Sequence, residues 1–363
     1  MSEQEKELRV LRDQIDGIDR EIHELLNKRA SCAQNVAEVK QRYQGSEAAV
    51  FYRPEREAQV LRRVMERNTG PLPDREVARL FREVMSVCLA LEEPMRVAFL
   101  GPEGTFTQQA AMKHFGHSAR NLPMQSLKDV FREVQAGSAH YGVVPIENSS
   151  EGVVSHTLDL FKQFDLKICG EVEVPVHLHL LLNKGDGLDE IAKIYSHEQS
   201  LAQSRSWLDA RFPHIEKVAV SSNAEAARLA KQEGSGYAAV AGDMAAELYD
   251  LDPAVKNIED QADNTTRFLI IGDQDVGPSG DDKTSILVSV PDAPGALYQL
   301  LEPFHRYGLS LTRVETRSAS KHSMFYIDFE GHSDDQVVKQ ALHDLTKESV
   351  ELKVLGSYPR AVL

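Results

Sequence analysis

LRVLRDQIDGIDREIHELLNKRASCAQNVAEVK, residues 8–40, is the stretch that decides the fold of the amino-terminal region. Apolar residues recur in it at steps of three and four, which predicts one long helix packed against other helices. The seam of this helix consists of Leu8, Leu11, Ile15, Ile18, Ile22, Leu25, Arg29, Cys32, Val36 and Val39. Arg29 is its one charged member. Because an unpaired buried guanidinium is costly, we expect Arg29 to meet an anion supplied by a ligand or by the protein itself.

The positions of Lys40 and Arg12 relative to Arg29 indicate where anions would bind along this helix. Lys40 follows Arg29 by eleven residues, so both side chains point the same way, about 16.5 Å apart along the helix. Arg12 precedes Arg29 by seventeen residues and lies about 100° round the helix. We therefore predict that Arg29 and Lys40 converge on one anion pocket and that Arg12 reaches a neighbouring one. The alternative for Arg29 is a structural ion pair with a glutamate. Two shorter helices, over about residues 53–68 and 74–93, complete the helical unit.

Residues 5–92 resemble the all-helical chorismate mutase domain. The resemblance implies an intertwined dimer that catalyses a Claisen rearrangement of chorismate to prephenate. This reaction needs no nucleophile or cofactor, only cations that fold the dianion and stabilise the charge building on its ether oxygen. Arg53 stands where an aspartate is usual, and Glu92 stands where a neutral glutamine commonly donates to the ether oxygen. The site residues implied are Arg12 from the partner chain, Arg29, Lys40, Arg53, Arg56, Glu57 on the substrate hydroxyl, Cys88 and Glu92.

The composition excludes several classes of partner. The 363 residues carry a net charge of -15, so neither a nucleic acid nor an anionic membrane is expected as the main partner. No apolar run reaches the length of a membrane span, and the first residues, MSEQEKELRV, lack the layout of a signal peptide, so we expect a cytoplasmic protein. Cys32, Cys88 and Cys169 lie far apart, which predicts reduced thiols and neither a disulfide framework nor a structural metal site.

After Pro94 short apolar runs alternate with helical segments. This alternation predicts an α/β region over residues 95–272, with the size of two small lobes and many parallel strands. Within it, residues 171–182 are predicted to form a single strand and residues 198–210 a single helix. Residues 272–282, GDQDVGPSGDD, have the composition of a linker. Residues 283–363 show the order βαββαβ of a ferredoxin-like sandwich.

Three segments of the α/β region place small polar residues where a helix is expected to begin. They are GPEGTFT at 101–107, PIENS at 145–149 and SHEQSLAQ at 196–203. Free backbone N–H groups and hydroxyls at such places suit a carboxylate ligand. Gly101 and Gly104 do not have the spacing of a dinucleotide fingerprint, so no nicotinamide cofactor is expected.

Together with the triplet Thr266-Arg267-Phe268, these segments make residues 95–272 resemble prephenate dehydratase. The resemblance implies a periplasmic-binding-like pair of lobes in which prephenate loses its ring carboxylate and its C4 hydroxyl to give phenylpyruvate. The proton donor stays open between Glu147 and a histidine, and Arg267 is either a carboxylate ligand or a structural ion pair. The residues implied are the catalytic hydroxyl of Thr266 and, in or beside the cleft, Asn148, Ser149, Ser196, Gln203, Arg267 and Phe268.

Residues 290–320 resemble an ACT domain, a module that binds amino acids where two copies meet. Gly295, Ala296 and Leu297 match the motif of phenylalanine-binding members. Glu315 opens the segment ETRS, which stands where Glu-Ser-Arg-Pro is usual. The alternative is a dimerisation sandwich that binds no effector.

The three resemblances occur in the order found in bifunctional chorismate mutase/prephenate dehydratase enzymes of phenylalanine biosynthesis. We therefore predict an all-α chorismate mutase domain (1–92), an α/β two-lobed dehydratase domain (95–272) and an α+β ferredoxin-like ACT domain (283–363). Such a chain acts as an isomerase and a lyase without cofactor or metal, is at least a dimer and is inhibited by phenylalanine.

Two other functions remain as alternatives. One is an amino-acid-responsive binding protein that kept the folds but lost the chemistry. The other is a mutase fused to an NAD-dependent prephenate dehydrogenase, which the missing glycine fingerprint disfavours.

Overall fold

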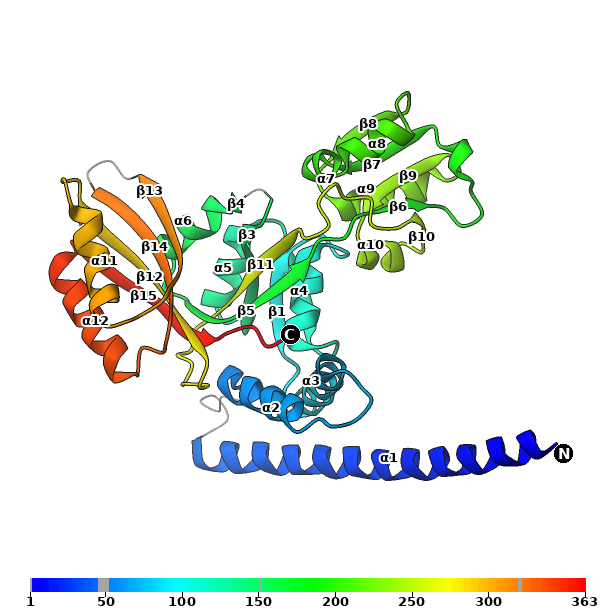
Figure 1. Cartoon of the computed structure of the whole chain (residues 1–363), viewed down its shortest axis with the longest axis horizontal. Coiled ribbons are helices and arrows are strands. Elements are labelled where there is room, and N and C mark those ends of the chain that lie inside the picture. Colours follow the sequence, from blue (N-terminus) through cyan, green and yellow to red (C-terminus); the bar gives the residue numbers. More distant parts are fainter. Residues whose placement is uncertain (1, 45–51, 151, 319–321) are drawn as a thin grey trace.

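The computed structural model describes residues 2–44, 52–150, 152–318 and 322–363. They form a helical domain, two α/β lobes and a C-terminal α+β domain, as Figure 1 shows. The predicted fold class is confirmed in these three parts. The helical domain contains α1 (Glu3–Gln44), α2 (Pro54–Glu66) and α3 (Asp74–Ala90). The predicted seam helix is therefore a single helix of 42 residues, which runs beneath α2 and α3 in Figure 1.

The first lobe is a six-stranded mixed sheet in the order β2-β1-β3-β11-β5, with β4 paired to β3. Strands β1, β2 and β3 are parallel, whereas β11 runs antiparallel to both of its neighbours. The strands are β1 (Arg96–Leu100), β2 (Arg120–Met124), β3 (Tyr141–Asn148), β4 (Gly152–Val153), β5 (Lys167–Pro175) and β11 (Thr265–Gly272). The helices are α4 (Phe106–Phe115), α5 (Leu127–Gln135) and α6 (Ser155–Gln163).

The second lobe has its own five-stranded sheet in the order β10-β6-β9-β7-β8. Its strands are β6 (His179–Leu182), β7 (Lys193–His197), β8 (Glu216–Val220), β9 (Tyr237–Ala241) and β10 (Asp252–Val255). Its helices are α7 (Glu198–Gln203), α8 (Arg205–Arg211), α9 (Asn223–Glu233) and α10 (Asp243–Leu248), with a short 3₁₀ turn at Leu188–Glu190. None of the helices in the described ranges is long and apolar enough to cross a membrane.

Two predictions about single elements in this region were wrong. Residues 171–182 form β5 and β6, which belong to different sheets, because the chain passes from one lobe to the other between Pro175 and His179. The apolar pattern hid this crossing, since Val174 is buried in the core of the first lobe and Leu178 in the core of the second. Residues 198–210 form α7 and α8, which are separated at the buried residue Ser204.

The C-terminal domain has the predicted order βαββαβ. Its antiparallel sheet runs β13-β14-β12-β15, with two helices packed on it. The elements are β12 (Asp282–Pro291), α11 (Ala296–Arg306), β13 (Leu311–Ser318), β14 (His322–Glu330), α12 (Gln336–Glu348) and β15 (Glu351–Pro359).

This domain shares a hydrophobic core with the first lobe. Leu287, Tyr326 and Leu355 lie in one buried cluster with Ile168 and other residues of the first-lobe sheet and helices. Strand β15 approaches β5 so closely that a Cβ atom on Gly356 would stand 2.3 Å from the carbonyl oxygen of Ile168. The C-terminal domain is therefore packed onto the first lobe, not tethered to it by a free linker.

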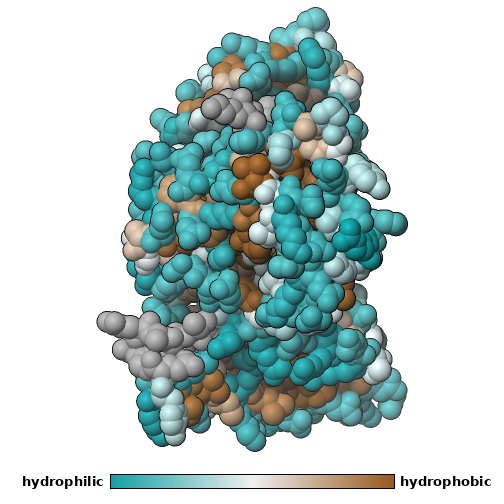
Figure 2. Space-filling view, turned by 90° about the vertical axis from the view of Figure 1, so that its left-hand side faces the viewer, coloured by the Kyte–Doolittle hydropathy of each residue, from teal (hydrophilic) through white to brown (hydrophobic). Residues whose placement is uncertain are grey.

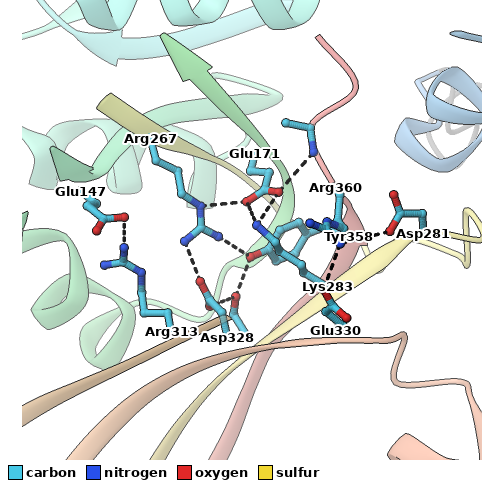
Figure 3. A network of polar contacts seen from close by, with 12 residues as sticks. Glu147, Glu171, Arg267, Asp281, Lys283, Arg313, Asp328, Glu330, Tyr358 and Arg360 are labelled. Atoms are coloured by element: carbon cyan, nitrogen blue, oxygen red, sulfur yellow. Dashed lines mark hydrogen bonds and ion pairs between the residues drawn. The ribbon is translucent and has the colours of Figure 1, made fainter. Parts of the chain in front are cut away.

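A buried cluster of four charges crosses the same interface, as Figure 3 shows. Arg267 on β11 places Nε 2.8 Å from Glu171 of β5 and Nη1 2.6 Å from Asp328 of β14. Lys283 of β12 lies 2.9 Å from the other oxygen of Glu171. Burial by itself would raise the pKa of Glu171, but Arg267 and Lys283 outweigh burial and hold the pKa of this carboxyl below its usual range. Two cations and two anions thus compensate one another across the domain boundary.

Replacing Glu171 tests how much this cluster stabilises the fold. Glu171→Gln leaves two buried cations opposite one carboxylate, so the free energy of unfolding should fall by about 3 kcal/mol. The matched control is Glu225→Gln, because Glu225 pairs with Arg228 on an exposed helix face and its loss should cost less than about 1 kcal/mol. Urea titrations followed by circular dichroism measure both changes, and equal midpoints for the two variants would contradict this role of the cluster.

Candidate functional site

An open cavity of about 420 Å³ lies between α1, α2 and α3. It brings together seven of the eight residues predicted for the mutase site, although they come from all three helices. The predicted residues that line it are Arg29, Lys40, Arg53, Arg56, Glu57, Cys88 and Glu92. Ala33, Val36, Val60, Met85 and Leu89 complete its apolar wall. Four cations around an apolar pocket suit a compact organic dianion.

Glu57 forms the buried side of this cavity. Its Oε1 lies 3.1 Å from Nε of Arg82 on α3, and Arg82 also donates to the carbonyl oxygen of Lys113 in α4. Burial raises the pKa of Glu57, and the charge of Arg82 offsets only part of that rise. Arg82 was not predicted, because nothing in the spacing of α3 marks a buried arginine.

Glu92 and Lys40 act on one another across the mouth of the cavity. Burial raises the pKa of Glu92, while the charge of Lys40 lowers it by less. Burial lowers the pKa of Lys40, and Glu92 partly restores it. The net rise at Glu92 favours a protonated carboxyl, which donates a hydrogen bond as a glutamine does.

Arg12 lies apart from this cavity. It precedes Arg29 by seventeen residues of the same helix, so the two Cα atoms are about 25 Å apart along α1. The apolar seam between them is uncovered in the described chain. Ile15, Ile18 and Leu25 are 56%, 56% and 64% exposed. Figure 2 shows a mostly hydrophilic face, with hydrophobic residues along its lower edge, at the height of α1 in Figure 1.

A second group of predicted residues meets where β3 ends and β11 begins. Asn148 and Thr266 are cross-strand partners, and Nδ2 of Asn148 donates to Oγ1 of Thr266 at 2.8 Å. The backbone N–H of Ser150 donates to Oδ1 of Asn148, which fixes the orientation of the amide. The Thr266 oxygen therefore accepts from Asn148, so its O–H can donate to a further acceptor.

A hydrogen-bond relay extends this group toward the second lobe. Ser149 Oγ donates to Oδ1 of Asn264, and Nδ2 of Asn264 donates to Oε1 of Gln203, both at 3.1 Å. Gln203 and Asn264 also line a cavity of about 260 Å³ between the lobes. Asn264 was not predicted, although it stands two residues before Thr266, a spacing that places both side chains on one face of a strand.

Other residues predicted for this site lie elsewhere. Ser196 is buried in the second lobe, where it donates to the carbonyl oxygen of Val240 and to Asn223. Phe268 is buried in the core of the first lobe. For Arg267, the structure favours the structural ion pair over a carboxylate ligand, because its guanidinium is buried and is paired with both Glu171 and Asp328. Glu147 pairs with Arg313 of the C-terminal domain.

The predicted effector residues lie on the C-terminal domain. Gly295 adopts φ +85° as the N-cap of α11, a left-handed conformation that favours glycine. Ala296 and Leu297 begin that helix, and Leu297 is exposed. Glu315 lies on β13, where its Oε1 is 3.4 Å from Nη1 of Arg313. The side chains of the last two residues of the ETRS segment lie outside the described side chains.

Comparison with known proteins yields three matching families in chain order. They are chorismate mutase type II over residues 11–93, prephenate dehydratase over residues 97–276 and the ACT domain over residues 284–346.

Two similar proteins align with this chain over its whole length. Those of Pseudomonas aeruginosa and Stutzerimonas stutzeri, both named bifunctional chorismate mutase/prephenate dehydratase, are 56% and 57% identical over 367 aligned positions that include all of both chains. The crystal structure of prephenate dehydratase from Arthrobacter aurescens in complex with L-Phe matches 74% of this chain and 90% of its own. It does so with a TM-score of 0.69 and 36% identity.

The raised pKa of Glu92 generates a prediction for the rearrangement of chorismate. If Glu92 lies on the ether oxygen, only its protonated form can donate there, so kcat/KM of the wild-type protein should fall as pH rises through the pKa of this carboxyl. Glu92→Gln keeps a donor at every pH and should flatten the profile. The measurement is kcat/KM from about pH 5 to about pH 9 at fixed ionic strength; parallel profiles for the two proteins would remove Glu92 from the mechanism.

Proposed function

The chain belongs to the bifunctional chorismate mutase/prephenate dehydratase family, and from that premise we propose which of its residues carry each activity. The protein is an isomerase and a lyase of phenylalanine biosynthesis. The chain is 56% and 57% identical, over its full length, to two relatives that are named as bifunctional enzymes. This similarity argues against the binding-protein and dehydrogenase alternatives. A cytoplasmic location is part of the proposal, as for other bacterial biosynthetic enzymes.

The mutase reaction is assigned to the cavity between α1, α2 and α3. Arg29, Lys40 and Arg56 bind the two carboxylates of chorismate and hold the molecule in its reactive shape, which supplies most of the rate by positioning. Glu57 holds the substrate hydroxyl from the buried side of the cavity. Glu92 donates to the ether oxygen, where negative charge builds as the bond breaks. The observation that carries this assignment is the convergence of these cations and carboxyls on one pocket.

The other two predicted residues of this cavity have supporting roles. Arg53 adds positive charge at the mouth, where it lowers the pKa of Lys40. Cys88 contributes a buried wall beside Glu92.

The dehydratase reaction is assigned to the end of β3 and the start of β11. Thr266 donates a hydrogen bond to the departing C4 hydroxyl of prephenate, and Asn148 orients Thr266 by donating to its oxygen. The ring carboxylate leaves as carbon dioxide, one proton is taken up, and water and phenylpyruvate result. Ser149, Asn264 and Gln203 line the path between the lobes and bind polar groups of the substrate.

Two further predicted residues act from a distance in this assignment. Ser196 holds Asn223 within the second lobe, and Phe268 packs the strand that carries Thr266. Neither reaction moves electrons to or from an external carrier, so the proposal requires no cofactor.

Feedback inhibition is assigned to the C-terminal domain. The Arthrobacter prephenate dehydratase was solved in complex with L-Phe, and this chain carries the Gly295-Ala296-Leu297 motif at the start of α11. Phenylalanine is therefore the effector that we propose. To inhibit, it must bind the less active arrangement of the enzyme more tightly than the active one.

We propose that the protein is at least a dimer joined through α1. The seam between Leu8 and Leu25 is apolar yet exposed in a single chain, and Val87 on α3 is also exposed. Such a stripe favours burial against a second copy. In that dimer Arg12 enters the cavity of the partner chain, which explains its distance of about 25 Å from Arg29.

Thr266→Ala tests the separation of the two activities. The variant should lose dehydratase activity while its mutase activity stays near that of the wild type, because the two sites lie in separate domains. Purified protein is supplied with chorismate alone, and prephenate and phenylpyruvate are quantified. Equal loss of both activities in a folded variant would contradict the separation, and a wild-type protein that forms no phenylpyruvate would contradict the dehydratase assignment.

Mixing Arg12→Ala with Arg29→Ala tests the exchange of Arg12 between chains. Each variant alone should be nearly inactive as a mutase, since each lacks one substrate-binding cation in every site. After subunit exchange, a heterodimer contains one site with both changes and one intact site, so mutase activity should return. Subunit exchange is verified with differently tagged chains. If the chains exchange but mutase activity does not return, Arg12 does not act across the dimer.

A further inference from the structure

Strands β3 and β11 carry two cross-strand pairs on opposite faces of the first-lobe sheet. Asn148 faces Thr266 in the register, and Glu147 faces Arg267 one step along. Successive side chains of a strand point to opposite faces, so the second pair points away from the hydrogen bond between Asn148 and Thr266. Both members of the second pair contact the C-terminal domain.

The C-terminal sheet offers a complementary pair. Arg313 on β13 and Asp328 on β14 are themselves cross-strand neighbours. Figure 3 shows the two contacts side by side: Arg267 with Asp328, and Glu147 with Arg313. We call these four residues the charge quartet. Each sheet supplies one cation and one anion, and each cation faces the anion of the other sheet. If the two sheets packed in another register, buried charges would lack partners.

Three of the four members of the charge quartet are shielded from solvent. Asp328 is fully buried, the side chains of Arg267 and Arg313 are 9% and 12% exposed, and Glu147 at the edge is 30% exposed. Ion pairs at this depth are weakly screened, and separating them leaves charges desolvated. A displacement of β13 or β14 is therefore transmitted to β3 and β11, which a solvated surface contact would not do.

Arg313 also connects the charge quartet to the proposed effector segment. Its guanidinium lies between two carboxylates, those of Glu147 and Glu315. A free amino acid brings an ammonium group, which suits a carboxylate such as Glu315 and competes there with Arg313. In the structure Arg313 is shared between both carboxylates; an ammonium group on Glu315 would leave it to Glu147 alone, and the residue next to Glu147 is Asn148.

We propose that the charge quartet positions Asn148 and Thr266 for dehydration, and that an effector at Glu315 alters the dehydratase rate through Arg313. Arg313 is thereby a positioning residue contributed by the C-terminal domain. The inference rests on the dehydratase and effector assignments made above. It adds the route by which the two sites communicate.

Arg313→Gln in the full-length protein tests the proposal. We expect dehydratase kcat to fall about tenfold, with KM changed by less than about twofold, because the change misplaces a catalytic hydroxyl without removing a substrate contact. At a saturating phenylalanine concentration, verified by calorimetry, most of the inhibition should be lost. The double variant Glu147→Gln/Arg313→Gln should be no worse than Arg313→Gln, since both changes break one interaction.

Arg306→Gln is the matched control, because Arg306 pairs with Glu302 and Asp344 on the surface of the same domain. It should leave dehydratase kcat and maximal inhibition unchanged. Circular dichroism verifies that every variant is folded, and mutase activity, which belongs to another domain, should stay unchanged. If Arg313→Gln behaves like the control, or if the double variant is clearly worse than Arg313→Gln, the proposal is overturned. If Arg313→Gln no longer binds phenylalanine, its dehydratase kcat without effector is the test: a fall of about tenfold supports the proposal, and an unchanged kcat overturns it. A wild-type protein without dehydratase activity would instead contradict the proposed function.

Discussion

The buried guanidinium of Arg267 is the constraint on which the arrangement of the domains depends. It stands one residue after Thr266 and requires two carboxylates, one from its own sheet and one from the C-terminal domain. A buried cation with only one of them would be strongly destabilising. Strand β11 and the C-terminal sheet therefore stand in one fixed register, and the hydrophobic core shared between them follows the same register. The position of Thr266 is set by contacts beyond the domain that performs the chemistry.

The sequence predicted those features that follow from one local pattern. The seam of α1 specified a long helix with Arg29 and Lys40 on one side, and both residues line the predicted cavity. The order βαββαβ specified the C-terminal sandwich for the same reason, since each element has its own hydrophobic period. In the dehydratase region the segments PIENS and TRF were informative because they stand at paired strand ends. Asn148 and Thr266 meet there as cross-strand partners.

Features that depend on tertiary contacts could not be predicted from the sequence. Arg82 lies within α3 without any local mark, and its role emerges only when Glu57 of α2 and the end of α4 are brought beside it. The predicted linker is another case. Its glycine and aspartate content is typical of a free connection, yet Arg62 of α2 donates to Ser279 and to the carbonyl oxygen of Asp281. Composition predicts the absence of regular structure there but not the docking of the segment on the helical domain.

The two candidate sites differ in how much of each one chain supplies. Hydrogen bonds join Asn148 to Thr266 and Asn264 to Gln203, so the residues proposed for dehydration are held together by contacts between strands and lobes of the same chain. A helix of 42 residues, by contrast, extends about 63 Å, well beyond the reach of α2 and α3. Its apolar seam cannot be buried by the rest of its own domain, and the cation at its far end cannot turn back to its own cavity. In the proposed dimer the length of α1 therefore ties mutase chemistry to assembly, whereas the proposed dehydratase residues depend on the register between two sheets.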